Sequence, residues 1–293
     1  MKLAAIDIGS NAARLLITEI IKNEKNETVF NKLNLVRVPL RLGFDVFESG
    51  IISNSKINMM LETMKSFRHL LNAYQVTHTI VCATSAMRDA KNADEVIQKI
   101  YAETKLLIEV ISGEKEANLV YENHIAENMD TDHSYLYIDV GGGSTELSFF
   151  SNSILTFKKS FNIGTIRLLK NMVQDSTWDE MKETLKLSVK EQKEVVAIGS
   201  GGNINKIFSL SKKKDGKSLS LELLKDYYKE LSHVSLEERI NKYCLKEDRA
   251  DVIVPALQIY INVMRWSGAQ EIYVPKIGLA DGLIRHLWDE IKS

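Results

Sequence analysis

The chain has 293 residues, of which 44% are hydrophobic and 26% are charged, an ordinary mixture for a globular protein of roughly two domains. Its net charge of −1 excludes the broad basic field that nucleic acid or an acidic membrane would demand, so we expect neither as a partner. The two cysteines, Cys82 and Cys244, lack the spacing of a metal site, and no apolar run reaches the roughly 18 to 20 residues of a spanning helix. These features favour a soluble cytoplasmic protein without a signal peptide.

The first half of the chain predicts three antiparallel strands, followed by helices that alternate with strands. Two apolar runs flank a Gly-Ser-Asn turn and indicate a hairpin, and the apolar residues that come later recur with the helical period. The predicted strands lie at residues 4–8, 15–21, 29–38, 79–83 and 106–111, and the predicted helices at 57–74, with Ser53 or Ser55 as its cap, and at about 93–104. This alternation is typical of α/β layers.

The second half repeats this plan and is interpreted as a divergent second copy. Predicted strands lie at residues 134–139, 146–150, 154–161, 195–199 and 271–274. A lysine-rich segment at 211–218 predicts an exposed loop. A long helix is expected at about 247–266, where Pro255 either kinks it or marks its real start, and an amphipathic helix at 279–291 ends the chain.

One device occurs twice: an apolar strand that ends in an aspartate and is followed at once by glycine and a hydroxyl. Asp7 precedes Gly9-Ser10-Asn11, and Asp139 precedes three glycines and Ser144. A carboxylate beside a turn with unhindered N–H groups suits a metal ion and a phosphate. The repeat therefore predicts a phosphate held between two related domains.

Three glycine-rich or hydroxyl-rich turns are candidates for phosphate binding. The triple glycine could be a flexible β-turn, but Asp139 and Glu146 flank it, and both are oxygen ligands that suit a hard cation such as Mg²⁺. The turn at residues 199–203 could present amides to an anion, yet Ile204 breaks the dinucleotide fingerprint there. Residues 84–89 follow a strand end, where α/β proteins bind ligands.

The sequence pattern alone does not decide whether Glu114, Glu116 and Arg14 have a structural or a functional role. Ser112 is a natural helix cap, and the helix dipole by itself explains Glu114 and Glu116 in the first turn without any chemistry. Arg14, inside the second strand, is either solvated or aimed at an anion. The six histidines show no paired spacing, which argues against zinc.

Taken together, these segments resemble the Ppx/GppA family of exopolyphosphatases and guanosine pentaphosphate phosphohydrolases, within the superfamily that includes actin. The matching segments are Asp7 to Asn11 with Arg14, residues 83–88, Ser112-Gly113 with Glu116-Ala117, and residues 139–146, 162–164, 199–202 and 249–253. The resemblance implies an α/β fold of two actin-like (ribonuclease H-like) domains, each a mixed five-stranded sheet flanked by helices, with the active site in the interdomain cleft. We expect the domains at 1–118 and 119–293, with the last helix, about 279–293, as a candidate to pack back on the first.

The resemblance also implies roles for individual residues. Glu116 would be the general base in the hydrolysis of a terminal phosphoanhydride bond, and Arg14 would assist catalysis by pointing at the phosphate chain. Asp139, Glu146 and Asp7 would hold Mg²⁺ or another divalent cation. The implied phosphate-binding residues are Ser10, Asn11, Thr84, Ser85, Arg88, Gly142, Gly143, Ser144, Gly201, Gly202 and Arg249.

Three departures from the family pattern bear on the substrate. Ala12 and Ala280 stand where a serine and an arginine are usual, and Pro255 stands where small residues are common. The first two could weaken anion binding. The expected substrate is inorganic polyphosphate, with guanosine pentaphosphate (pppGpp) as the main alternative; a nucleotide-dependent kinase or ATPase and a weakly catalytic sensor of such ligands are more remote. A homodimer is an option by resemblance alone.

Overall fold

The structure, a computed structural model, describes residues 1–121, 133–190, 192, 194–275 and 277–292. Contacts divide the chain into two compact units, Met1–Asn123 with Leu279–Ser293, and His124–Gly278. The final helix, α13 (Leu279–Lys292), belongs to the first unit because it packs on that unit's strands, whereas Ser293 lies outside the described residues. The domain limits expected from the sequence, and the cleft between the domains, stay predictions.

The first unit is built on one mixed sheet with the order β3-β2-β1-β4-β5. Its strands are β1 (Lys2–Ile8), β2 (Ala13–Lys22), β3 (Thr28–Val38), β4 (His78–Ala83) and β5 (Glu109–Val110). The β1–β2 and β2–β3 pairs are antiparallel, while β4 and β5 run parallel to β1. The predicted hairpin and third strand are confirmed. The strand predicted at 106–111 is shorter than expected because its ladder with β4 covers only Glu109 and Val110.

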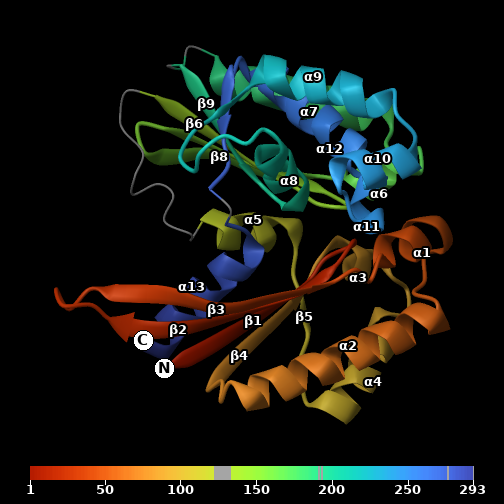
Figure 1. The fold of residues 1–293 in the computed structure, drawn as a ribbon, viewed down its shortest axis with the longest axis vertical. Coiled ribbons are helices and arrows are strands. Elements are labelled where there is room, and N and C mark those ends of the chain that lie inside the picture. Colours follow the sequence, from red (N-terminus) through yellow and green to blue (C-terminus); the bar gives the residue numbers. More distant parts are fainter. Residues whose placement is uncertain (122–132, 191, 193, 276, 293) are drawn as a thin grey trace. The chain divides into compact units, whose positions relative to one another are not determined.

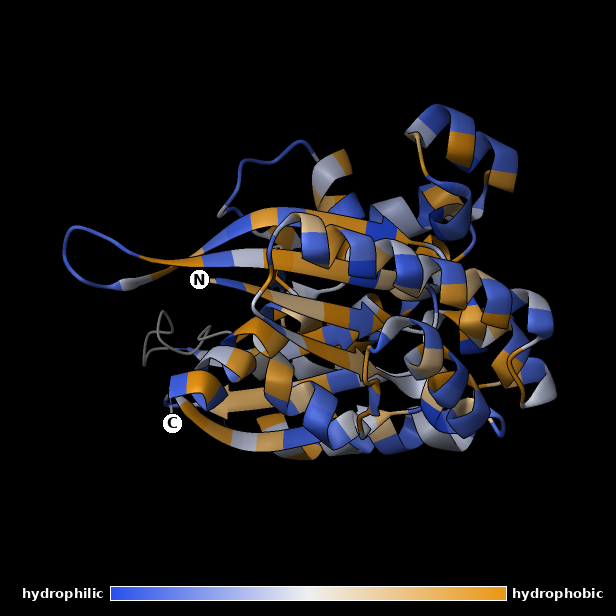
Figure 2. Ribbon diagram, turned by 90° about the horizontal axis from the view of Figure 1, so that it is seen from below, coloured by the Kyte–Doolittle hydropathy of each residue, from blue (hydrophilic) through white to orange (hydrophobic). Residues whose placement is uncertain are grey.

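Helices cover both faces of this first sheet (Figure 1). They are α1 (Leu42–Ser49), α2 (Asn54–Ala73), α3 (Ser85–Asp89), α4 (Ala93–Thr104), α5 (Gly113–Tyr121) and α13. Helix α2 packs against α4, and α13 packs against β1, β2, β4 and α5. The Ser53 side chain, and not Ser55, caps α2 by accepting from the Lys56 amide at 3.4 Å. Figure 2 shows hydrophilic and hydrophobic bands alternating along the helices, as the sequence periodicity predicts.

The second unit repeats the strand order of the first and adds one strand. Its sheet has six strands in the order β10-β11-β9-β6-β7-β8. The strands are β6 (Ser134–Val140), β7 (Thr145–Ser151), β8 (Ile154–Phe161), β9 (Val195–Ser200), β10 (Leu219–Ser220) and β11 (Glu271–Tyr273). The prediction of five strands is corrected by β10, whose two residues are too short to show a period. The remaining five reproduce the order and directions of the first sheet, which confirms two related α/β units with mixed sheets.

The core of the second unit lies between its sheet and a central helix. The helices are α6 (Thr165–Leu169), α7 (Asp175–Val189), α8 (Gly202–Leu210), α9 (Leu221–Ser232), α10 (Leu236–Tyr243), α11 (Glu247–Ala250) and α12 (Ile253–Ser267). Helix α12 packs on α7, α8, α9 and β6. The long helix expected at 247–266 is therefore two helices. Pro255 is the third residue of α12, where its missing N–H costs no helical hydrogen bond, so it marks a helix start and not a kink.

No described helix is long and apolar enough to cross a membrane. Both cysteines are thiols, Cys82 buried on β4 and Cys244 exposed after α10. Burial, with the charge of nearby Glu109, raises the pKa of the Cys82 thiol to about 12. Since the thiolate is the reactive form, Cys82 should be inert at neutral pH for two reasons, access and ionisation.

We therefore expect only Cys244 to react when the folded protein is treated with a colorimetric disulfide reagent at about pH 8. Denaturation should expose Cys82 and double the released chromophore. The Cys244→Ser variant, as control, should show no reaction until it is denatured. Rapid labelling of that variant in its folded state would contradict the described burial of Cys82.

Candidate functional site

The two aspartate-turn devices fold into the same hairpin with different charges. Asp7 pairs across β1 and β2 with Arg14, and Asp139 pairs across β6 and β7 with Glu146. Each turn is closed by the same bond: the Gly9 amide donates to the Ala12 carbonyl at 3.0 Å, as the Gly141 amide does to the Ser144 carbonyl at 2.9 Å. The register thus makes the two devices equivalent residue by residue, and the second-strand position is an arginine in one and a carboxylate in the other.

The glycine turn of the second unit is held by its carbonyl groups. The amides of Thr165 and Ile166 donate to the Gly141 and Gly142 carbonyls at 3.0 and 2.9 Å, and the Arg167 Nε donates to the Gly143 carbonyl at 2.8 Å. In a trans peptide the C=O and the next N–H point in opposite directions. The N–H groups of residues 142, 143 and 144 are therefore directed away from α6. These are the three residues of this turn that the sequence predicts to bind phosphate.

The turn of the first unit is held in the same way. The Gly43 and Arg41 amides donate to the Ser10 and Asn11 carbonyls, each at 2.8 Å. The same trans-peptide argument directs the N–H groups of residues 11 and 12 away from the start of α1. Ala12 can therefore offer its backbone amide to an anion although it lacks the usual hydroxyl. The Ser10 hydroxyl bonds to the Ser85 hydroxyl at 2.7 Å, which joins this turn to the start of α3.

Gly164 supports the glycine turn by leaving room for it. A Cβ at this position would lie 2.4 Å from the Gly142 carbonyl oxygen and from the Gly143 carbonyl carbon. Its φ of −136° is one that any residue can adopt, so glycine is needed here for close approach alone.

Arg14 and Asp7 form a close ion pair in the first unit, with Nη1 and Oδ2 2.7 Å apart. Burial raises the pKa of the Asp7 carboxyl above its ordinary value, and the charge and hydrogen bond of Arg14 oppose that rise. The Arg14 side chain remains one-third exposed. The arginine therefore offsets the buried negative charge of its register partner. Metal binding by Asp7 and substrate contact by Arg14 stay predictions.

Glu116 lies buried in the first turn of α5, a helix that Ser112 caps by accepting from the Lys115 amide at 3.1 Å. Its Oε2 is 3.9 Å from Nη1 of Arg88, and Arg88 also donates to the Ile111 carbonyl at 2.7 Å. Glu114, two residues earlier, is exposed.

The candidate residues of the first unit gather at one edge of its sheet. Thr84 donates its amide to the Ile8 carbonyl at 3.1 Å, which ties the end of β4 to the end of β1. Because β1, β4 and β5 run parallel, the segments that follow them start at the same edge. The Asp7 hairpin, Thr84 with Ser85, Arg88 and Glu116 all lie on those segments or strand ends.

Asp139 and Glu146 have the arrangement that suits a hard cation. Residues directly opposite in an antiparallel pair project on the same face with Cβ atoms roughly 5 Å apart. Ser160, the register partner of Glu146 on β8, donates its hydroxyl to Glu146 Oε1 at 2.7 Å. No group of three or more metal-ligating side chains occurs among the residues that the structure describes. Two carboxylates fit Mg²⁺, which keeps several waters and binds through one or two carboxylates and substrate oxygens.

The third glycine turn lies beside this pair. Gly201 has a φ of +110°, which favours glycine, and a Cβ there would lie 3.4 Å from Asp139 Oδ1. Arg249 donates through Nη1 to the Gly202 carbonyl, so its guanidinium rests against the first turn of α8. The structure brings Gly201, Gly202 and Arg249 together, and their contact with an anion stays a prediction.

Sequence reasoning missed four residues that support these turns: Ser160, Arg167, Ser200 and Tyr260. Ser160 and Ser200 could be found only through the strand register, which places them opposite Glu146 and Asp139. Tyr260, whose hydroxyl donates to the Ser200 carbonyl, looks like one more core residue of an apolar helix. The hydroxyl of Tyr260 was the one feature of the sequence that could have revealed this role, because a buried phenol needs a hydrogen-bond partner.

Two related α/β units, each with a turn whose amides point away from the helix that holds it, and a carboxylate pair beside one of these turns are typical of proteins that bind phosphate groups. The chain belongs to the Ppx/GppA phosphatase family, whose sequence model matches residues 20–290. The recognition made from the motifs is thereby confirmed.

Two curated relatives are similar over different lengths. A bifunctional 3-dehydroquinate synthase/phosphatase of Fusobacterium nucleatum is 33% identical over 191 residues, which cover 64% of this chain and 29% of that protein. A guanosine-5'-triphosphate,3'-diphosphate pyrophosphatase of Pseudoalteromonas translucida is 28% identical over 298 aligned positions, covering 96% of this chain and 57% of that protein. The chain therefore spans less than two thirds of the length of either relative.

Solved structures share the fold at low sequence identity. An exopolyphosphatase from Cytophaga hutchinsonii superposes with a TM-score of 0.84 at 24% identity, covering 99% of this chain and 98% of that one. A Ppx/GppA family member from Aquifex aeolicus gives 0.76 at 23% identity, covering 100% and 99%. These likenesses establish the fold alone.

The packing of Gly164 against the glycine turn predicts that Gly164→Ala displaces residues 142 and 143. Overpacking of this kind costs about 1 to 3 kcal/mol, and it should also weaken phosphate binding because the turn amides move. Thermal unfolding and titration with inorganic phosphate measure the two effects. Gly278→Ala is the control for stability, because its Cβ would meet nothing within 4 Å. Unchanged unfolding and phosphate affinity in Gly164→Ala would contradict the close approach.

Proposed function

We propose that the protein is an exopolyphosphatase that hydrolyses the terminal phosphoanhydride bond of inorganic polyphosphate and releases orthophosphate. The observation that carries the proposal is the pairing of Asp139 with Glu146 beside the outward-facing amides of residues 142–144. Such a set can hold a phosphate and a cation together, and family membership supports the reaction. The proposal draws on groups from both units.

Glu116 is the proposed general base that orients and deprotonates the attacking water. Support comes from its burial at the start of α5 and from the positive charge of the Arg88 guanidinium, 3.9 Å from its Oε2. The exposed Glu114 has no such support. In the same proposal Arg14 contacts the phosphate chain, and Ser10, Asn11, Thr84, Ser85 and Arg249 contribute further anion contacts.

Mg²⁺ or another divalent cation is proposed at Asp139 and Glu146, with Asp7 as a third candidate ligand. When bound, such a cation supplies charge neutralisation at the phosphate oxygens. Asp7 is the weaker candidate, because Arg14 already neutralises it. The Ser160 hydroxyl fixes one oxygen of Glu146 and so sets the orientation of this carboxylate.

Hydrolysis of guanosine pentaphosphate is the second candidate function. It is favoured by the similarity, over 96% of this chain, to a protein named as a guanosine-5'-triphosphate,3'-diphosphate pyrophosphatase. Both substrates end in a phosphoanhydride-linked phosphate, so the same turns and base could serve either one. A sensor that binds such ligands with weak catalysis is the remote alternative.

Phosphate release from polyphosphate of defined length and from guanosine pentaphosphate, each with Mg²⁺ and with a chelator, tests reaction, substrate and metal together. We expect release from polyphosphate with Mg²⁺ and its loss with chelator. Faster release from the guanosine nucleotide would replace the first candidate by the second. Ligand binding without release from either substrate would favour the sensor.

The role of Glu116 is tested by Glu116→Gln, which keeps the shape of the side chain and removes its basicity. Turnover should fall by about 10²- to 10⁴-fold while substrate binding survives. Glu114→Gln is the matched control two residues away and should leave turnover near that of the unaltered protein. Equal rates for both variants would remove Glu116 from the mechanism.

A further inference from the structure

Four polar side chains stand in register across the second sheet near the carboxylate pair. Ser160 on β8 pairs with Glu146 on β7, Glu146 pairs with Asp139 on β6, and Asp139 pairs with Ser200 on β9. Register partners in neighbouring strands project on the same face of a sheet. Ser200 therefore shares a face with Asp139 and Glu146, at the end of a strand that leads directly into the Gly201-Gly202 turn.

The Ser200 hydroxyl is a buried polar group without a hydrogen-bond partner in the part of the chain that the structure describes. Its side chain is 1% exposed, and its Oγ has no hydrogen-bond partner among the described residues. A buried hydroxyl without a partner destabilises a protein, and a bound water or ion is one of the explanations for such a group in a native structure. The position of Ser200 in register with Asp139 and Glu146 indicates that this ligand belongs to the carboxylate pair.

The Asp139 carboxylate leans toward the strand that carries Ser200. Its Oδ1 lies 3.4 Å from the position where a Cβ of Gly201 would be, next to Ser200 in the chain. An oxygen held near both groups would thus meet an acceptor from Asp139 and a hydroxyl from Ser200. Mg²⁺ and similar cations keep several of their waters when they bind to protein carboxylates, so such an oxygen is expected in their hydration shell.

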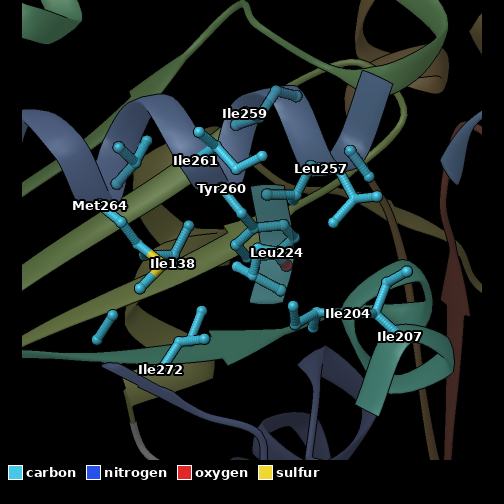
Figure 3. Packing of buried hydrophobic residues seen from close by; sticks show 14 of the residues in the cluster. Ile138, Ile204, Ile207, Leu224, Leu257, Ile259, Tyr260, Ile261, Met264 and Ile272 are labelled. Atoms are coloured by element: carbon cyan, nitrogen blue, oxygen red, sulfur yellow. The ribbon is translucent and has the colours of Figure 1, made fainter. Parts of the chain in front are cut away.

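Tyr260, on helix α12, forms a hydrogen bond with the backbone of Ser200. It is fully buried in α12 and points into the apolar cluster with Ile138, Leu224 and Ile204 (Figure 3). Its hydroxyl donates to the Ser200 carbonyl and lies 3.6 Å from the same Gly201 Cβ position. Burial, followed by the charge of Asp139, raises the pKa of Tyr260 well above its ordinary value, so the phenol stays a donor. A phenol in this core fixes the end of β9 as an aliphatic side chain could not.

We propose that Ser200 belongs to the cation site, where its hydroxyl binds a water of the cation's hydration shell, and that Tyr260 is the positioning residue that holds Ser200 in place. This rests on the cation site of the proposed function. It adds two residues to that site and assigns them different roles: Ser200 contacts the hydrated cation, and Tyr260 acts through Ser200.

Binding of Mn²⁺, followed by the loss of its free electron-spin-resonance signal, tests the proposal without any turnover. We expect Ser200→Ala to weaken Mn²⁺ binding by about 10- to 100-fold, the usual effect of losing an outer-shell partner. The melting temperature should stay equal or rise, because the variant removes an unsatisfied hydroxyl. If Ser200 had only a structural role, its substitution would not lower Mn²⁺ affinity while leaving the melting temperature equal or higher.

Two matched controls exist in the same unit. Ser134, at the other end of β6, is also a fully buried serine whose hydroxyl has no partner among the described residues, so Ser134→Ala should change stability alike and leave Mn²⁺ affinity alone. Tyr260→Phe keeps the ring and loses the donor, and it should weaken Mn²⁺ binding about 10-fold. Tyr227→Phe, on α9 beside the same core, should not.

The double variant Ser200→Ala with Tyr260→Phe separates positioning from direct contact. If Tyr260 acts through Ser200, the double variant binds Mn²⁺ no more weakly than Ser200→Ala. Additive losses would overturn the assigned order, and unchanged Mn²⁺ affinity in Ser200→Ala would overturn the proposal. Phosphate release by the unaltered protein is judged separately: Mn²⁺ binding without release would contradict the proposed function and leave this inference standing.

Discussion

The constraint on which both hairpin turns depend is a set of hydrogen bonds to their carbonyl groups, donated by the segment that follows the third strand of each sheet. In the first unit Arg41 and Gly43 donate to this turn, and in the second unit Thr165, Ile166 and Arg167 do so. Because each peptide is planar and trans, the N–H group that follows each bonded carbonyl points away from the segment that binds the carbonyl. The direction of the amides proposed to bind phosphate is thus set by bonds on the other side of the turn, and Gly164 matters because it lets that segment come close.

The equivalent hairpins of the two units carry different charge pairs: an aspartate with an arginine in the first unit, and two carboxylates in the second. The proposed roles of the two hairpins differ accordingly. In the first hairpin, Arg14 on the second strand forms an ion pair with Asp7, so the two charges cancel. At the equivalent position Glu146 stands opposite Asp139, so the second hairpin places two carboxylates side by side, the kind of oxygen ligand that the proposed cation prefers. The two units share one strand order, and the residue at this single register position distinguishes the hairpin with an ion pair from the hairpin proposed to hold a cation.

Local features of the sequence were enough for the parts that depend on local chemistry. Glycine, serine and aspartate at strand ends predicted the turns, and apolar periodicity predicted the helix at 57–74 and most strands. Register was beyond reach, because the β7–β8 ladder shifts between Phe149 and Phe150, and β6 meets β9 only through a long crossover. Ser160 and Ser200 gain their meaning from those pairings. The break before α12 was ambiguous because proline suits a helix start as well as a kink.

The departure at Ala12 illustrates why side-chain identity alone misjudges such a site. The equivalent residue of the second turn, Ser144, offers a hydroxyl and an amide, whereas Ala12 offers an amide alone. The amide is set by the fold, through the Asn11 carbonyl bonded to Arg41, and survives the substitution. Ser10, whose hydroxyl reaches Ser85, keeps one side-chain oxygen in that turn. Losing the serine at position 12 therefore removes one donor from a set whose geometry the backbone maintains.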